Sequence, residues 1–232
     1  MNSTQLASFT RMTRVLAGVS IVPALFLPFY EAFLHGGRRA VDINPRAAAY
    51  MGAHMLGAYC MLLAGFGLLA IYLRYHDRMG GIAPLSLILA LLAQASYAGT
   101  LFIDGFFNPL LAHYDPVIQT QFHTGDFSGA VAHSALLQSF GIVLYIPILM
   151  SLLYIVGIGL LGIIILLKRF LPWPIGILFL VNGLILGIAL MVPMWVEVMG
   201  YAAEGLAITW SAFLIWRESK PARVPGQLAL HP

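Results

Sequence analysis

Six long apolar runs follow one another along this chain, and each is long enough to cross a lipid bilayer as a helix. About 20 apolar residues of helix span the hydrocarbon core. With 60% hydrophobic and 9% charged residues, the chain lacks the roughly one-quarter of charged residues that covers a soluble domain. We therefore expect an all-α fold, a polytopic membrane bundle of six transmembrane helices. The runs lie at residues 15–34, 50–73, 83–107, 132–167, 174–192 and 195–216.

The chain is expected to form one domain over residues 1–219, with an irregular outer loop at 108–131 and a disordered cytoplasmic tail at 220–232. The first run follows basic residues, as in a secretory signal, but it contains two prolines and a glutamate and lacks a small-residue cleavage site. We predict that it is a retained helix. The fourth run is longer than a bilayer requires, and we expect it either to project past the interface or to bend at Pro147, where a backbone hydrogen bond is lost.

Basic residues are distributed unevenly between the two sides of the predicted bundle. With the N-terminus inside, nine lysines and arginines fall on the cytoplasmic side and three on the other. Because cytoplasmic loops of membrane proteins are enriched in these residues, both termini are predicted to be cytoplasmic. The net charge of +3 then reflects loops at a membrane surface. We expect the lipid bilayer and no nucleic acid as a partner, and the sequence leaves an oligomer open.

Most carboxylates and histidines gather on the opposite, outer side of the predicted bundle. Ionisable side chains inside a bilayer are costly and usually functional. Glu204 lies deepest, near the middle of the last run, and Glu197 lies seven residues before it on the same helical face. In the third run, Gln94, Tyr97 and Asp104 form a loosely common stripe.

These side chains predict an outward-facing polar cavity inside the membrane. Such a cavity would bind or transport a small cationic or lipid-like molecule, or protons. The candidate ligand-binding residues are Glu204, Glu197, Asp104, Gln94, Tyr97, His54, His133 and Glu31.

Two other functions are compatible with the same side chains. One is a membrane-embedded enzyme acting on a lipid-soluble substrate, either a carboxylic-acid catalyst with Glu204 and Asp104 as catalytic residues or a metal-dependent hydrolase. Zinc would take His54, His133 and Asp104 as ligands, although no His-x-x-x-His pair is present; a haem would take the two histidines. The other function is a structural subunit of a membrane complex, with polar groups that pair with partner helices.

Several polar residues also have a plainer interpretation. A histidine at a helix end is usually interfacial and hydrated, and we expect this of His35, His133 and the loop histidines. Gln94 and Asn182 are expected to hydrogen-bond between helices. The glycine-rich segments 57–67 and 157–162 are expected to allow close helix packing.

The last third of the chain carries two short motifs. Residues 168–173 read Lys-Arg-Phe-Leu-Pro-Trp before the fifth run, and residues 204–210 read Glu-Gly-Leu-Ala-Ile-Thr-Trp within the sixth. In these motifs the chain resembles an uncharacterised bacterial family of six-helix integral membrane proteins, a domain of unknown function. The resemblance implies a multi-pass protein of the plasma membrane, the bacterial inner membrane, with Glu204 at a recurring position. It implies no established activity.

Overall fold

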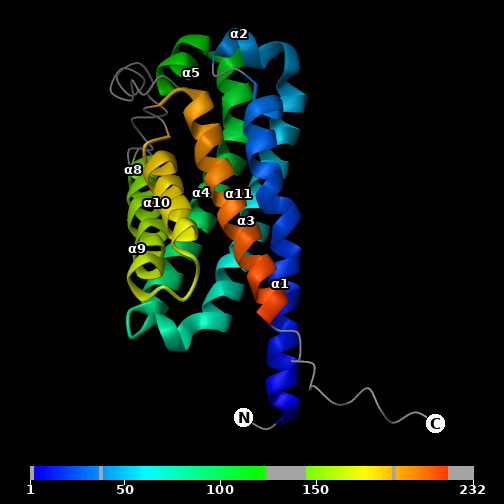
Figure 1. Ribbon diagram of the computed structural model, residues 1–232. Helices are drawn as coiled ribbons and strands as arrows, with labels where there is room; N and C mark the ends of the chain where they lie inside the picture. Colours follow the sequence, from blue (N-terminus) through cyan, green and yellow to red (C-terminus); the bar gives the residue numbers. More distant parts are fainter. Residues whose placement is uncertain (1–2, 37–38, 124–144, 190–191, 219–232) are drawn as a thin grey trace, which may run out of the picture.

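The computed structural model of the protein describes residues 3–36, 39–123, 145–189 and 192–218, and every regular element in these ranges is a helix (Figure 1). The long helices are α1 (Ser3–Phe29), α3 (Ala47–Met79), α4 (Ala83–Tyr114) and α11 (Met194–Glu218). The shorter α-helices are α2 (Ala40–Ile43), α5 (Pro116–His123), α8 (Tyr145–Leu153), α9 (Gly159–Lys168) and α10 (Trp173–Gly187). Two π-helical turns, η1 (Tyr30–Leu34) and η4 (Tyr154–Ile158), and a 3-10 turn, η2 (Asn44–Arg46), complete the set.

Within the described ranges, five helical stretches are long and apolar enough to cross a membrane, which fits the predicted multi-pass membrane protein. They are Ala7–Leu34, Ala40–Met79, Ala83–Tyr114, Leu149–Lys168 and Met194–Glu218. The predicted span at 174–192 corresponds to α10, which has only 15 residues. At 1.5 Å per residue α10 is about 22 Å long, less than the roughly 30 Å of hydrocarbon core. Six full spans are therefore not confirmed.

The helices pack in a ring around the long axis of the molecule (Figure 1). Along this ring α1 packs on α3, α3 on α4, α4 on η4, η4 on α10, α10 on α11, and α11 on α1. A further contact between α11 and α3 closes the interior. Because many apolar side chains on the outside stay exposed while the interior is densely filled, the bundle has the pattern expected of helices surrounded by lipid.

The upper end of the bundle is more regular than the sequence suggests. α4 continues past Pro109 to Tyr114 and is followed by α5, so residues 108–123 of the predicted irregular loop are largely helical. A hydrogen bond holds the upper end of α4: the side chain of Asn44 donates to the carbonyl oxygen of Ala112 at 2.8 Å. Residues 124–131 of that loop and the tail at 220–232 lie outside the described residues.

Both π turns interrupt longer helices. η1 begins two residues after Pro28, where the missing N–H already breaks the regular hydrogen bonding of α1. In the fourth span, Pro147 lies in the first described turn of α8, so a bend there stays a prediction. Within the described part of this span, the irregular turn is η4, which begins seven residues after Pro147. π turns inside α-helices often occur at functional sites, and the turns here carry Glu31 and Tyr154.

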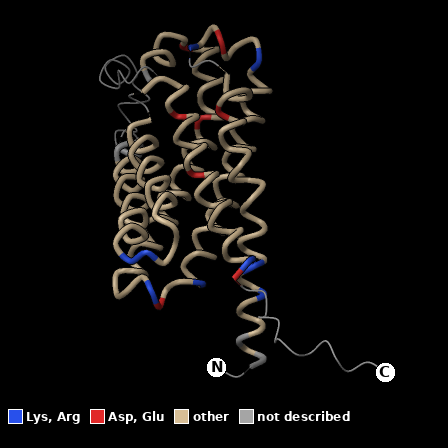
Figure 2. Tube along the Cα trace, viewed as in Figure 1, with Lys and Arg blue, Asp and Glu red and all other residues tan. Residues whose placement is uncertain are grey.

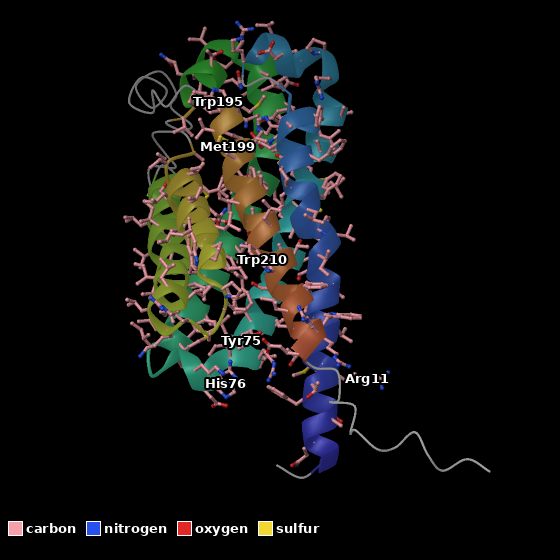
Figure 3. All side chains as sticks on the ribbon, viewed as in Figure 1. Arg11, Tyr75, His76, Trp195, Met199 and Trp210 are labelled. Carbon is pink, nitrogen blue, oxygen red and sulfur yellow. The ribbon has the colours of Figure 1, made fainter. Side chains whose placement is uncertain are left out.

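Charged residues mark the two ends of the bundle. Figure 2 shows lysine and arginine near its ends and acidic residues inside its upper half. α1 begins and α11 ends at the lower end (Figure 1). There Arg74 and Glu218 form an ion pair of 3.3 Å between α3 and α11, near Tyr75 and His76 in Figure 3. This charge distribution is compatible with the predicted orientation, in which the lower end is cytoplasmic.

Candidate functional site: an acidic pocket in the upper half of the bundle

A small pocket lies in the upper half of the bundle. Its volume is about 50 Å³, enough for roughly three to five water-sized groups. The described residues that line it are Glu31, His35, Tyr97, Thr100, Leu101, Asp104, Met150, Ala189, Glu197 and Tyr201. Among these described residues no lysine or arginine is present, and His35 is the basic side chain that shares the wall with the three carboxyl groups.

The three carboxyl groups come from three different elements. Glu31 lies in η1, Asp104 in α4 and Glu197 in the first turn of α11. Glu31 and Glu197 are buried, with exposed fractions of 1% and 5%, whereas Asp104 is half-buried. Figure 3 labels Trp195 and Met199 on α11, and both side chains are exposed. Glu197, which lies between them in the sequence, is buried. The ring of helices therefore gathers its acids on the inside.

α10 contributes to the pocket by ending early. Its last helical residue is Gly187, and Ala189, two residues further on, lines the pocket. The last carbonyl groups of a helix carry partial negative charge, because they lack helical N–H partners. An apolar helix that stops inside the bundle thus adds a second source of negative potential near the carboxyl groups.

Aromatic rings line part of the pocket, and further rings pack against them from the side away from the pocket. Tyr30 contacts His35, His54 and Tyr201, with ring centroids 6.0, 5.8 and 6.5 Å away. The His54 ring lies 4.7 Å from His35 and 4.0 Å from Tyr50. Nδ1 of His54 donates to the carbonyl oxygen of Tyr50 at 2.9 Å, which fixes the tautomer of a neutral ring. His54 therefore lies directly behind the pocket wall and does not line the pocket.

Close backbone approach makes room for these rings. A Cβ atom on Gly57 would lie 3.0 Å from the Tyr30 ring, and one on Gly105 would lie 2.9 Å from Cβ of His54. The expected role of the segments 57–67 and 157–162 in close packing is confirmed at Gly67, Gly157 and Gly162 as well.

Glu204 occupies a separate position one level deeper. It is fully buried, and its two carboxyl oxygens accept hydrogen bonds from Nε2 of Gln94 on α4 and, at 3.2 Å, from Nδ2 of Asn182 on α10. Asn182 also donates to the carbonyl oxygen of Gly200 at 3.1 Å. The expectation that Gln94 and Asn182 hydrogen-bond between helices is thus confirmed.

Two tyrosines separate the pocket from Glu204. Tyr97 lies three residues after Gln94 on α4, and Tyr201 lies three residues before Glu204 on α11, so each tyrosine stands one turn above its neighbour. Their rings meet at right angles with centroids 6.0 Å apart. Both tyrosines line the pocket, while Glu204, Gln94 and Asn182 do not.

The predicted ligand-binding set therefore divides into three parts. Glu31, Tyr97, Asp104 and Glu197 line one pocket; Gln94 and Glu204 form the deeper cluster; His54 lies behind the pocket wall. His133 lies outside the described residues. The sequence predicted one cavity lined by Glu204, Asp104 and His54 together. In the structure, only Asp104 of these three residues lines the pocket.

Sequence reasoning missed six of the described pocket residues, and two of these, His35 and Tyr201, carry rings with a titratable group. His35 was expected at a hydrated interface, but it is only 7% exposed because η1 turns it inward against Tyr30 and Tyr50. Tyr201 could have been found from spacing, since it lies four residues after Glu197 and three before Glu204 on one helical face.

The described residues contain no group of three or more histidine, cysteine or acidic side chains close enough to hold a metal ion. The three carboxyl groups surround a space and do not converge on one point. The zinc and haem hypotheses both also need His133, so they stay predictions.

Comparisons with protein-family models, with curated proteins and with solved structures found no match.

Proposed function

We propose that this multi-pass membrane protein binds a small cation that donates hydrogen bonds, an ammonium or compact alkylammonium ion, in the acidic pocket, with protons competing for the same carboxyl groups. The observation that carries the proposal is the lining of the pocket: Glu31, Asp104 and Glu197 share about 50 Å³. Carboxyl groups buried together favour protonation or a nearby positive charge, and a bound cation would add such a charge beside His35 in the same wall.

The spacing of the carboxyl groups favours an ammonium-type ion over a bare metal ion. A metal needs several ligands at one point, and the described side chains do not offer this arrangement. An ammonium group instead directs up to four N–H donors outward, toward acceptors distributed around a cavity. The pocket volume of about 50 Å³ suits a compact ligand such as ammonium or methylammonium.

The rest of the wall supports a cationic ligand. The rings of Tyr97 and Tyr201 line the pocket, and aromatic faces attract ammonium groups. The carbonyl end of α10 lies nearby and adds negative potential.

Thermal unfolding of the purified protein in detergent tests the proposal. Ammonium and methylammonium chloride should raise the unfolding temperature in a saturable way, because a ligand at 100 times its dissociation constant stabilises the folded state by about 2.7 kcal/mol. Tetramethylammonium, which has no N–H donor, and sodium chloride at equal ionic strength should not.

Pocket variants sharpen the test. Asp104→Asn and Glu197→Gln should lose the methylammonium effect, while the control Asp77→Asn, at an exposed acid near the lower end of α3, should keep it. Equal stabilisation by all four salts, or loss of the effect in the Asp77 control, would contradict the proposal.

A further inference from the structure

The cluster formed by Glu204, Gln94 and Asn182 lies beneath the acidic pocket and has chemistry of its own. Glu204 and Asn182 are fully buried and Gln94 is 2% exposed. Within the described residues, no lysine or arginine is paired with Glu204, and its hydrogen-bond donors are the two neutral amides. A buried carboxyl group with neutral partners changes its charge only by binding or losing a proton.

The two amides are not equivalent. The NH2 group of Asn182 has both of its donors in use, one to Gly200 and one to Glu204. These two hydrogen bonds to α11 fix the orientation of the Asn182 side chain. The Gln94 amide makes one hydrogen bond within the described residues, to Glu204, and therefore lacks the second hydrogen bond that Asn182 has.

The amide oxygen atoms of both residues are buried and lack a hydrogen-bond partner in the described part of the structure. An ionised carboxylate only accepts hydrogen bonds, whereas a protonated carboxyl group also has one O–H donor. If the Gln94 amide turns over about its last bond, Oε1 takes the place of Nε2 and accepts that O–H. The same pair of side chains can therefore satisfy either protonation state of Glu204.

We propose that Glu204 is a reversible proton-binding site in which Gln94 is the switching partner and Asn182 the fixed one. The step is balanced: the carboxylate takes up one proton, the Gln94 amide rotates, and its oxygen accepts the new O–H. Loss of the proton reverses both changes. This inference does not require the outer pocket to bind a cation, because none of the three residues lines that pocket.

The surroundings of Glu204 contain other titratable groups, and none of them replaces its amide partners. Tyr97 on α4 and Tyr201 on α11 lie one turn above, and Tyr154 on η4 donates to the sulfur atom of Met61 on α3 at 3.2 Å. From α1, the carbonyl oxygen of Ala24 lies against Gly205. The buried titratable residues of α3 on this half include Tyr50, His54 and Cys60; Nδ1 of His54 donates to the carbonyl oxygen of Tyr50, and Cys60 is a free thiol.

Infrared difference spectroscopy between acidic and alkaline buffer tests this proposal on the folded protein in detergent. The wild type should show the C=O band of a protonated carboxyl group that disappears at alkaline pH and that shifts when glutamate is labelled with heavy carbon. Glu204→Gln should lack this band. Asp104→Asn and Glu197→Gln should keep it, which separates the deeper site from the pocket.

Gln94→Met provides the specific test of the switch, because methionine has a similar shape and no amide. The titration midpoint of the band should rise by about one to two pH units, since the ionised form loses a hydrogen bond to a charged group. An Ala control at Ser8, an exposed position of α1, should leave the midpoint unchanged. Labelled wild type without any pH-dependent glutamate band, or an unchanged midpoint in the folded Gln94 variant, would overturn the proposal.

Discussion

At the scale of single residues, the acids inside this bundle have two different kinds of surroundings. Glu204 is bonded to two amides from neighbouring helices, while Glu31, Asp104 and Glu197 face a shared space. A buried hydrogen bond contributes modestly, but a buried polar group left without its partner costs about 1–3 kcal/mol. The amides around Glu204 therefore have a structural effect as well as a chemical one.

A double-mutant cycle measures this effect. Asn182→Ala should lower the free energy of unfolding by about 1–3 kcal/mol, because Gly200 and Glu204 each lose a donor. In a Glu204→Ala background, part of that cost should be absent, which gives a coupling energy of about 0.5–3 kcal/mol in denaturant unfolding. Additive effects of the two substitutions would show that the hydrogen bond between them contributes nothing.

At the scale of helices, close contacts position the site. Gly157 in η4 lies against the backbone of α4, where a Cβ atom would come within 2.5 Å of the carbonyl oxygen of Leu89. Because backbone cannot move aside like a flexible side chain, this contact fixes the distance between η4 and α4. The same two elements carry Tyr154 and Tyr97, whose rings meet 5.2 Å apart beside the site.

Gly157→Ala should therefore destabilise the protein by about 1–3 kcal/mol through overpacking, measured by thermal unfolding in detergent. The matched control is Gly99→Ala in α4, where a Cβ atom meets nothing within 4 Å. That change should be neutral or stabilising by up to about 1 kcal/mol, because alanine favours helix. Similar losses in both variants would show that the packing of η4 on α4 is not tight.

Sequence patterns predicted the helices well where a run of apolar residues alone decides the structure, as in α3 and α11. They did not predict where α10 ends, because residues 188–192 are as apolar as the helix itself. Of the two π turns, η1 follows Pro28, whereas neither η4 nor the end of α10 directly follows a proline. For the site, helical spacing placed Glu197 and Glu204 on one face, but it could not show that Tyr201 divides them into two levels.

At the scale of the whole molecule, charge and packing combine into one arrangement. Basic residues lie near the ends, apolar side chains cover the outside, and the buried acids lie within the upper half of the bundle (Figure 2). A ring of helices with one short member can hold a small polar space without exposing it to lipid. This arrangement links the composition of the chain to the proposed cation site.

The most direct test of the cation site is proton release from the detergent-solubilised protein, followed with a pH indicator in weakly buffered, mildly acidic solution. If methylammonium and protons compete for Glu31, Asp104 and Glu197, adding methylammonium must displace protons. We predict saturable proton release from the wild type, none with tetramethylammonium, and none from a variant with all three acids replaced by their amides. Equal release from the wild type and that variant would contradict the account.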